Sequence, residues 1–261
     1  MSVIALTIAG SDSSGGAGIQ ADLKTFVAFG VYGASVITAL TAQNTVGVRA
    51  IAEVDAKFVA QQIDAVVEDL KVGAAKTGML ARVAIIEAVA DRLRAHRLPY
   101  LVVDPVMVAT SGDVLLEPQA VDCLRRQILP LATLLTPNLR EAEILAGRPV
   151  TDAAQMRDAA RHLIDTGVSA VLIKGGHLAG DALDILYDGK TFQEFSAPQI
   201  ATRNTHGTGC TLSAAVAACL ARGFTLDESV AAAKRYITRA IATAPGIGHG
   251  AGPVNHFASA D

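Results

Sequence analysis

The chain has 261 residues, of which 51% are apolar and 18% charged, and its formal net charge at pH 7 is −3. This composition provides a large hydrophobic core, excludes intrinsic disorder as the main state and fits a single domain over residues 1–261. The weakly acidic balance, with four Tyr and no Trp, argues against a nucleic-acid partner, and the longest wholly apolar run, 214–221, is far short of the ~20 residues that a membrane-spanning helix needs.

Short β-branched runs alternate with segments of helical period, which is typical of parallel βαβ units. The first run, 3–9, has no basic residue before it and leads into a glycine-rich turn, so it is interpreted as a strand and not as a signal peptide. Several runs are apolar on both faces, as expected of strands that helices cover on two sides. The predicted strands are 3–9, 34–42, 73–77, 100–104, 132–136 and 170–174.

Helices are predicted between these strands. In the first, Ile19, Leu23 and Phe26 share one face at helical spacing, and Gly30 is placed to end it. The segments 58–70 and 83–94 repeat this pattern.

The last third of the chain has a different pattern. The segments 181–187 and 191–196 flank Asp188-Gly189, a dipeptide typical of hairpin turns, so they predict an antiparallel edge of the sheet. Two helices follow, at 208–222 and 226–244, and both end at glycine or proline. The glycine-rich tail, 246–253, is interpreted as a mobile loop or a terminal flap. The sequence therefore predicts an α/β fold with a mostly parallel central sheet and an antiparallel edge.

The cysteines indicate a reducing compartment. There are three, an odd number, and none stands in a C-x-x-C pair, so neither a disulfide framework nor a thiolate zinc site is expected. A cytoplasmic location follows from this pattern and from the missing secretion signal.

Two segments imitate nucleotide-binding fingerprints. Gly16-Ala-Gly-Ile-Gln-Ala21 fits G-x-G-x-x-A, but no acidic residue stands between positions 23 and 52 to bind the ribose of a dinucleotide. Gly189-Lys-Thr191 resembles the end of a phosphate loop, but Asp184 stands at the position of its first glycine. Neither segment predicts nucleotide binding by the motif that it imitates.

A stronger anion-binding signal precedes the alanine-rich helix at 208–222. The backbone N–H groups of Gly207, Thr208 and Gly209 can converge on an anion at the start of that helix. Cys210 stands in the first helical turn, where the helix dipole stabilises a thiolate. The alternative is that Thr208 only caps the helix and Cys210 only packs in the core.

Four polar residues stand at or shortly after the ends of predicted strands, at the edge where open α/β sheets bind ligands. Asp104 is suited to hold a metal or a phosphate, and Lys174, at the end of a buried strand, needs a carboxylate or phosphate partner. Glu141 can order the water shell of Mg²⁺ bound to a nucleotide. The alternative for Asn138 and Glu141 is a capping box that merely begins a helix.

Further polar residues point to the same edge. Asp22 is placed in the first turn of the first helix, where the dipole explains it without a ligand. Gln43 and Asn44 end the second predicted strand, and Met79 follows the third. Each is more often structural than functional, but together they predict one cleft.

In this order the segments resemble the ribokinase superfamily and, within it, the hydroxymethylpyrimidine/phosphomethylpyrimidine kinases of thiamine biosynthesis, the ThiD type. The superfamily commonly ends its glycine motif with an Asp base, whereas this branch has Cys, as at position 210. The resemblance spans nearly the whole chain, and its carriers are the segments 9–25, 41–45, 76–80, 103–107, 136–141, 174–177 and 204–213.

The resemblance implies a ribokinase-like, three-layer α/β/α fold. It also implies an ATP- and Mg²⁺-dependent kinase that phosphorylates 4-amino-5-hydroxymethyl-2-methylpyrimidine and then its monophosphate. A cytoplasmic homodimer is expected, with no nucleic-acid or membrane partner.

The same resemblance assigns roles to the site residues. The segment 207–210 would bind the transferring phosphoryl group, and the Cys210 thiolate would accept the proton of the substrate hydroxyl once the helix terminus has lowered the pKa of the thiol. Asp104, Asn138 and Lys174 would bind the phosphates of ATP, and Glu141 and Asp104 would act on Mg²⁺ through water or phosphate. The residues expected to contact the pyrimidine are Gly10, Asp22, Gln43, Met79 and Val106.

Two alternatives stay open. Some pyridoxal kinases resemble this family and keep the cysteine, and pyridoxal is also a flat aza-aromatic ring with a hydroxymethyl group. Gln43 favours the pyrimidine, because its amide can donate to a ring nitrogen and accept from the amine. A catalytically silent nucleotide-binding module is the other alternative, against which Asp104, Glu141, Lys174 and Cys210 argue.

Overall fold

The structure is a computed structural model that describes residues 2–107, 117–176 and 180–260. His177, part of one family-like segment, lies outside these residues. The described strands are β1 (Ile4–Asp12), β2 (Tyr32–Gln43), β3 (Val48–Glu53), β4 (Ala74–Thr77), β5 (Leu101–Val103), β6 (Leu134–Leu135), β7 (Val171–Gly175), β8 (Ala182–Tyr187) and β9 (Phe192–Ala197).

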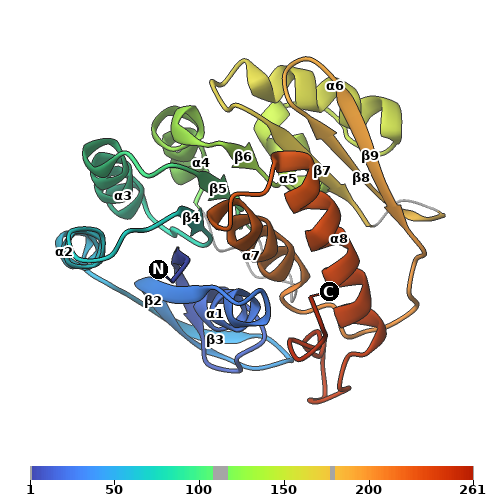
Figure 1. The fold of residues 1–261 in the computed structure, drawn as a ribbon, viewed down its shortest axis with the longest axis horizontal. Coiled ribbons are helices and arrows are strands. Elements are labelled where there is room, and N and C mark those ends of the chain that lie inside the picture. Colours follow the sequence, from blue (N-terminus) through green and yellow to red (C-terminus); the bar gives the residue numbers. More distant parts are fainter. Residues whose placement is uncertain (1, 108–116, 177–179, 261) are drawn as a thin grey trace.

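These strands form one nine-stranded sheet in the order β3-β2-β1-β4-β5-β6-β7-β8-β9 (Figure 1). The central strands from β2 to β7 pair in parallel, while β8 and β9 are antiparallel at one edge and β3 is antiparallel at the other. The predicted fold class is therefore confirmed, with a second antiparallel edge that the sequence did not reveal.

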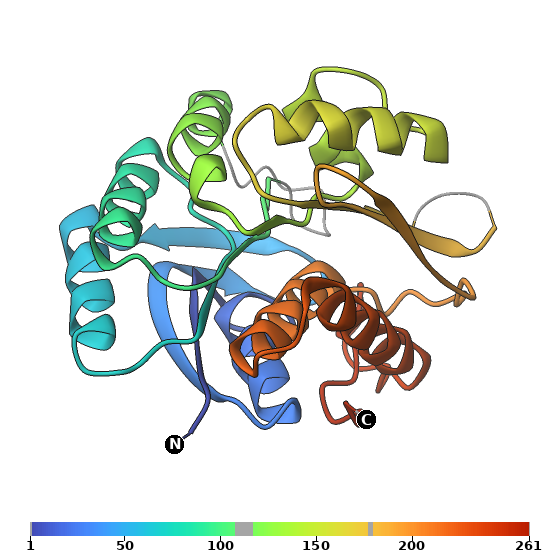
Figure 2. The same cartoon turned by 45° about the horizontal axis from the view of Figure 1, so that its top comes forward.

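Helices cover both faces of the sheet, which gives three layers. One face packs against α2, α3, α4, α5 and α6, and the other packs against α1, α7 and α8. Figure 2 shows α7 and α8 side by side, on the face opposite to α3 and α4. The described helices are α1 (Gly18–Ala28), α2 (Ala56–Val67), α3 (Val83–His96), α4 (Pro118–Gln127), the 3₁₀ turn η1 (Leu129–Leu131), α5 (Leu139–Ala146), α6 (Ala153–Ile164), α7 (Thr208–Ala221) and α8 (Leu226–Ala242).

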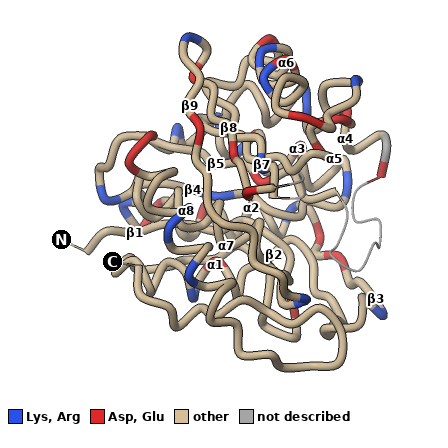
Figure 3. The backbone as a smooth tube through the Cα atoms, turned by 90° about the vertical axis from the view of Figure 1, so that its right-hand side faces the viewer, with Lys and Arg blue, Asp and Glu red and all other residues tan. Residues whose placement is uncertain are grey.

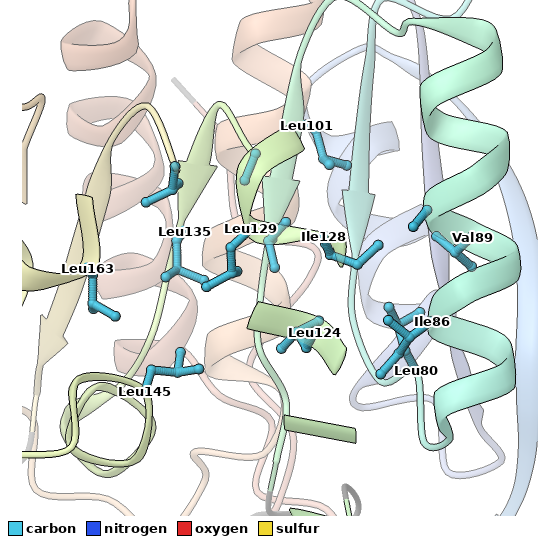
Figure 4. Packing of buried hydrophobic residues seen from close by; sticks show 14 of the residues in the cluster. Leu80, Ile86, Val89, Leu101, Leu124, Ile128, Leu129, Leu135, Leu145 and Leu163 are labelled. Carbon is cyan, nitrogen blue, oxygen red and sulfur yellow. The ribbon is translucent and has the colours of Figure 1, made fainter. Parts of the chain in front are cut away.

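The central strands supply side chains to both cores, because successive residues of a strand point to opposite faces. In β5, Leu101 and Val103 join the core under α2 to α6, while Val102 joins the core under α7 and α8. Leu134 and Leu135 of β6 divide in the same way. Figure 4 shows part of the first core, in which leucine, isoleucine and valine side chains fill the layer between helices and sheet.

Several elements differ from the sequence predictions. β3 was missed because all but one of its residues are exposed, so it lacks the alternation that marks a strand. Three helices, α4 to α6, were also not predicted, although Asn138 does begin α5. Asp22 was wrongly placed in a first helical turn, because α1 starts at Gly18 and has no acidic residue there.

Charge is spread over the molecule in both signs. Positive and negative residues are interspersed on the outer helices and turns, as on α6 (Figure 3). None of the described helices is both long enough and apolar enough to cross a bilayer.

A buried ion pair joins α1 to the centre of the sheet. Lys76 of β4 and Asp22 of α1 are fully buried, and Lys76 Nζ lies 2.9 Å from both carboxylate oxygens of Asp22. Thr7 Oγ1 of β1 donates a further hydrogen bond of 2.6 Å to Asp22 Oδ2. Burial alone would lower the pKa of Lys76, but the adjacent Asp22 outweighs it and the net shift of that pKa is upward.

We expect Lys76→Met to lower the free energy of unfolding by about 3–5 kcal/mol, because it leaves the Asp22 carboxyl buried without its cation. The double variant Lys76→Met/Asp22→Leu is expected to recover most of that loss, since neither partner is then stranded. Urea unfolding followed by circular dichroism measures both. A single variant as stable as the wild type would contradict this account of the pair.

Candidate active site

One cavity of about 900 Å³ lies at the carboxyl ends of the parallel strands. The ends of β1, β2 and β7 and the segments that follow β4, β5 and β6 all reach it. The structure brings together in its lining every predicted site residue except Asp22: Gly10, Gln43, Met79, Val106, Asp104, Asn138, Glu141, Lys174, Gly207, Thr208, Gly209 and Cys210.

The anion-binding segment begins α7 with a glycine. Gly207 is the N-cap residue, with φ +79°, and a Cβ there would overlap the carbonyl oxygen of Gly16, so the close approach requires glycine. Thr208 turns its hydroxyl away, donating to the carbonyl of Thr205 at 2.7 Å. The alternative that Thr208 caps the helix is therefore wrong, because α7 begins at Gly207 without a side-chain cap and the N–H of Thr208 itself donates to the carbonyl of Thr205 at 3.2 Å.

A cation and a carboxylate stand beside this helix start. Lys174 Nζ lies 2.9 Å from Asp104 Oδ1, which gives the strand-end lysine its expected anionic partner. A Cβ on Gly209 would lie 3.1 Å from Lys174 Nζ, so glycine lets the ammonium group approach the first turn of α7. Burial by itself raises the pKa of Asp104, but Lys174 and Lys76 together hold it below its ordinary value.

The capping-box interpretation of Glu141 is confirmed, and its role toward Mg²⁺ stays a prediction. Glu141 forms a capping box with Asn138, in which Glu141 Oε2 accepts from Asn138 N at 2.8 Å and Asn138 Oδ1 accepts from Glu141 N at 2.9 Å. It also lines the cavity, where burial and the neighbouring Asp104 raise the pKa of Glu141 to about 7. Near neutral pH this carboxyl can therefore change its charge when a cation binds.

Cys210 differs from its prediction in one property. It lies in the first turn of α7, half-buried at the cavity wall, as expected. Burial, however, raises the pKa of its thiol to about 11, and the carboxylates of Asp22 and Asp104 add to the effect. Lys76 and the backbone N–H of Gly18 act in the opposite direction without overcoming it. The predicted lowering of this pKa by the helix terminus is therefore wrong.

The other end of the cavity combines an amide with apolar surfaces. Gln43 ends β2, and Thr41 Oγ1 lies 3.0 Å from Gln43 Oε1, so this contact orients the amide. Met79 and Val106 pack together with Ala39 of β2 and with Ala81. A Cβ on Gly10 would lie 2.8 Å from the terminal methyl group of Met79, so glycine leaves room for that side chain.

Asp22 is separate from the lining. Its carboxylate is fully buried and already bound to Lys76 and Thr7. Contact of Asp22 with a substrate stays a prediction, and its observed partners connect it to the fold.

Sequence reasoning missed a buried Asp–His contact at this site. His206 Nε2 lies 2.7 Å from Asp12 Oδ2, and both side chains are buried. Although burial opposes it, hydrogen bonds from His206 and Ser14 lower the pKa of Asp12 to about 2. Both residues stood in segments that the sequence analysis singled out, but 194 positions separate them and no local pattern reveals such a pair.

A second missed pair, Lys234 and Asp184, lies in the cavity wall on α8 and β8. Lys234 Nζ is 2.8 Å from Asp184 Oδ2 and 2.7 Å from the carbonyl oxygen of Ala182. The available signal was a lysine on the helix face that Val230 and Ile237 share, because a lysine on a buried face needs a partner.

Comparisons with known proteins show the family of this chain. A family model described as phosphomethylpyrimidine kinase matches residues 12–255. The chain belongs to this family. A curated relative from Rhizobium meliloti (strain 1021), named hydroxymethylpyrimidine/phosphomethylpyrimidine kinase, is 58% identical over 98% of both chains. The resemblance predicted from the sequence is therefore confirmed.

Solved structures confirm the family's fold in this chain. The phosphomethylpyrimidine kinase of Clostridium difficile 630 superposes with a TM-score of 0.83 at 46% identity, covering 92% of this chain and 99% of the other. The pyridoxal kinase of Bacillus subtilis, solved with ADP, superposes with a TM-score of 0.93 at 41% identity, covering 99% and 98%. Because both enzymes share the fold with this member of the family, the fold alone does not separate the two substrates.

We expect Cys210 to react slowly with iodoacetamide at neutral pH. Because only the thiolate reacts, the rate should rise about tenfold for each pH unit and keep rising well beyond about 8.5, where an ordinary thiol levels off. Mass spectrometry of the peptide that contains Cys210, after timed alkylation between pH 7 and 10.5, gives the profile. Cys210→Ser identifies the signal, and a plateau near pH 8 would contradict the raised pKa.

Proposed function

We propose that this chain transfers a phosphoryl group from MgATP to 4-amino-5-hydroxymethyl-2-methylpyrimidine and then a second one to the monophosphate. The observation that carries the proposal is the uncapped start of α7, with Cys210 in its first turn, inside the cavity that also holds Gln43 and Lys174. Phosphoryl transfer depends mainly on positioning and on charge stabilisation, and this arrangement provides both.

We assign the start of α7, at 207–209, to the transferring phosphoryl group, with the N–H groups of Gly207 and Gly209 as donors, because that of Thr208 already donates to the carbonyl of Thr205. Lys174, already next to the start of α7, supports this role with its positive charge.

Magnesium ion fits the charge of this end of the cavity. Asp104 and Glu141 both line it, and oxygen ligands are those that Mg²⁺ prefers. Among the described residues no group of three or more His, Cys, Asp and Glu side chains could hold a metal directly. We therefore assign Asp104 and Glu141 to Mg²⁺ through water or phosphate, where the ion would neutralise phosphate charge.

At the substrate end, Gln43 recognises the polar edge of the pyrimidine, while Met79 and Val106 contact its faces and Gly10 leaves space for its substituents. The Cys210 thiolate accepts the proton of the hydroxymethyl group. Because the pKa of the free thiol is about 11, this base function is expected to increase with pH above neutrality. By family resemblance we expect the enzyme to act as a homodimer in the cytoplasm.

Pyridoxal phosphorylation is the second candidate. It stays a candidate because the Bacillus subtilis pyridoxal kinase is 41% identical to this chain and has the same fold over 99% of it. Pyridoxal lacks the amine of the pyrimidine, so the Gln43 amide would lose one partner on it.

A coupled ADP-release assay with MgATP tests the proposal on the hydroxymethylpyrimidine, its monophosphate and pyridoxal side by side. We expect turnover of both pyrimidine species and slow turnover of pyridoxal. Efficient turnover of pyridoxal alone would replace the proposed substrate by the second candidate.

Gln43→Leu extends the same assay to the placement of the ring. It should weaken binding of the pyrimidine by about 1–3 kcal/mol, because the polar edge of the ring loses its partner. Gln61→Leu, on the exposed surface of α2, is the matched control. Equal effects of the two variants would argue against this placement.

Cys210→Ala is expected to lower turnover by about 10²-fold or more while ATP still binds, because the variant loses its proton acceptor. Isothermal titration with ATP and steady-state turnover separate the two effects. Cys219→Ala, in the buried middle of the same helix, is the matched control and should retain activity. Wild-type turnover by Cys210→Ala would exclude the thiolate from catalysis.

A further inference from the structure

The turn between β2 and β3 touches the chain's tail, more than 200 positions away. Thr45 lies in this turn, two residues after Gln43. Its Oγ1 accepts hydrogen bonds of 3.2 Å from the backbone N–H groups of both His249 and Gly250. In Figure 1 the tail after α8 runs back past this end of the hairpin.

Glycines make this contact possible. A Cβ on Gly250 would overlap the carbonyl oxygen of Thr45, and one on Gly248 would overlap the Thr45 side chain. Gly248 has φ +85°, whereas the backbone of Gly250 is outside the left-handed region. Glycine is therefore required at position 250 because of the contact with Thr45, and not because of the backbone conformation.

The tail continues from this contact to the anion-binding segment. His206 N donates to the carbonyl of Gly252 at 3.0 Å, and Val254 N donates to the carbonyl of His206 at 3.4 Å. His206 directly precedes Gly207, the N-cap residue of α7. The tail thus joins the hairpin that carries Gln43 to the segment that carries Cys210.

A second route joins the same two segments on the other side. Ser13 Oγ lies 2.8 Å from both the backbone N and the backbone O of Gln43. Its neighbour Asp12 binds His206. The two routes, Thr45 to the tail to His206 and Gln43 to Ser13 to Asp12 to His206, close a ring of contacts around the substrate end of the cavity.

We propose that Thr45 is a positioning residue for phosphoryl transfer. Its contact with the tail closes this ring and holds Gln43 in register with the segment 207–210. The contact lies at the surface and consists of two long hydrogen bonds, so it contributes little to stability and can open and close. Reacting groups must be held within a fraction of an ångström, and the site must exclude water from the phosphoryl group.

This proposal rests on the proposed function. Thermodynamic linkage gives it a second consequence. If the Thr45 contact strengthens substrate binding, substrate binding must strengthen the contact by the same factor. Bound pyrimidine should therefore slow hydrogen exchange in the tail, at 248–252, although no tail residue from 245 to 253 lines the cavity.

Three variants separate the contact from its surroundings. Thr45→Val keeps the shape but removes the acceptor, Thr45→Ser keeps the acceptor, and Gly250→Ala places a methyl group against the Thr45 carbonyl. Thr191→Val, in the β8–β9 turn, is the matched control, because Thr191 Oγ1 also makes a surface hydrogen bond, to Asp188, away from the cavity. Melting temperatures verify that each variant folds.

For Thr45→Val and Gly250→Ala we expect the KM for the pyrimidine to rise about five- to tenfold, the change that follows from losing two modest hydrogen bonds. The KM for ATP should change little, and ATP hydrolysis without pyrimidine should increase as water enters. Thr45→Ser and Thr191→Val should behave as the wild type. If the contact were merely structural, the variants would change the melting temperature, but the KM for the pyrimidine would not rise while the KM for ATP stayed the same.

The proposal is overturned if both variants keep the wild-type KM and hydrolysis rate although hydrogen exchange shows that the contact has opened. If the wild type turns over neither pyrimidine nor pyridoxal, the proposed function fails separately. In that case, hydrogen exchange measured without substrate tests whether the ring of contacts couples the hairpin turn to the segment 205–210. A coupled ring predicts faster exchange at 205–210 in Thr45→Val, and a local contact predicts changes only at 44–47 and 248–252.

Discussion

The site depends on one buried contact, between Asp12 at the end of β1 and His206 before α7. Asp12 also accepts the backbone N–H groups of Ser14, Gly16 and Ala17, so a single carboxylate organises the loop that leads into α1. Because its pKa is about 2, this carboxylate is charged at neutral pH. Two segments from opposite ends of the chain are thereby fixed around one cavity.

The second constraint is the pairing of buried charge. Lys76 is bound by Asp22, Lys174 by Asp104 and Lys234 by Asp184, so each of these buried ammonium groups has a carboxylate partner. Burying an unpaired charge would cost several kcal/mol, which explains why these partners come from different elements of the fold. Burial raises the pKa of the Cys210 thiol, and the pairing prevents Lys76 from overcoming this, because the nearby Asp22 and Asp104 carboxylates act against it.

These two constraints connect the fold to the chemistry of the family. Parallel strands bring their carboxyl ends to one edge, so residues at the ends of β1, β2 and β7 and just after β5 meet although they are distant in the sequence. The glycines at 207 and 209 then let backbone and Lys174 approach more closely than any side chain would permit. The proposed anion site, the carboxylates assigned to a cation and the amide assigned to the substrate ring are brought together by this convergence.

The sequence by itself determined the layered α/β fold, because apolar periodicity and turn residues act locally, and all but one of the site residues that it selected line the cavity. It could not show β3, whose exposed residues carry no periodic signal, or the partners of Asp22 and Lys234, which packing chooses across the fold. The direction of the pKa shift of the Cys210 thiol was predicted wrongly for the same reason. A sequence shows where a helix begins. The loss of water around the thiol and the neighbouring carboxylates outweigh the effect of the helix terminus on the pKa, and both exist only once the chain has folded.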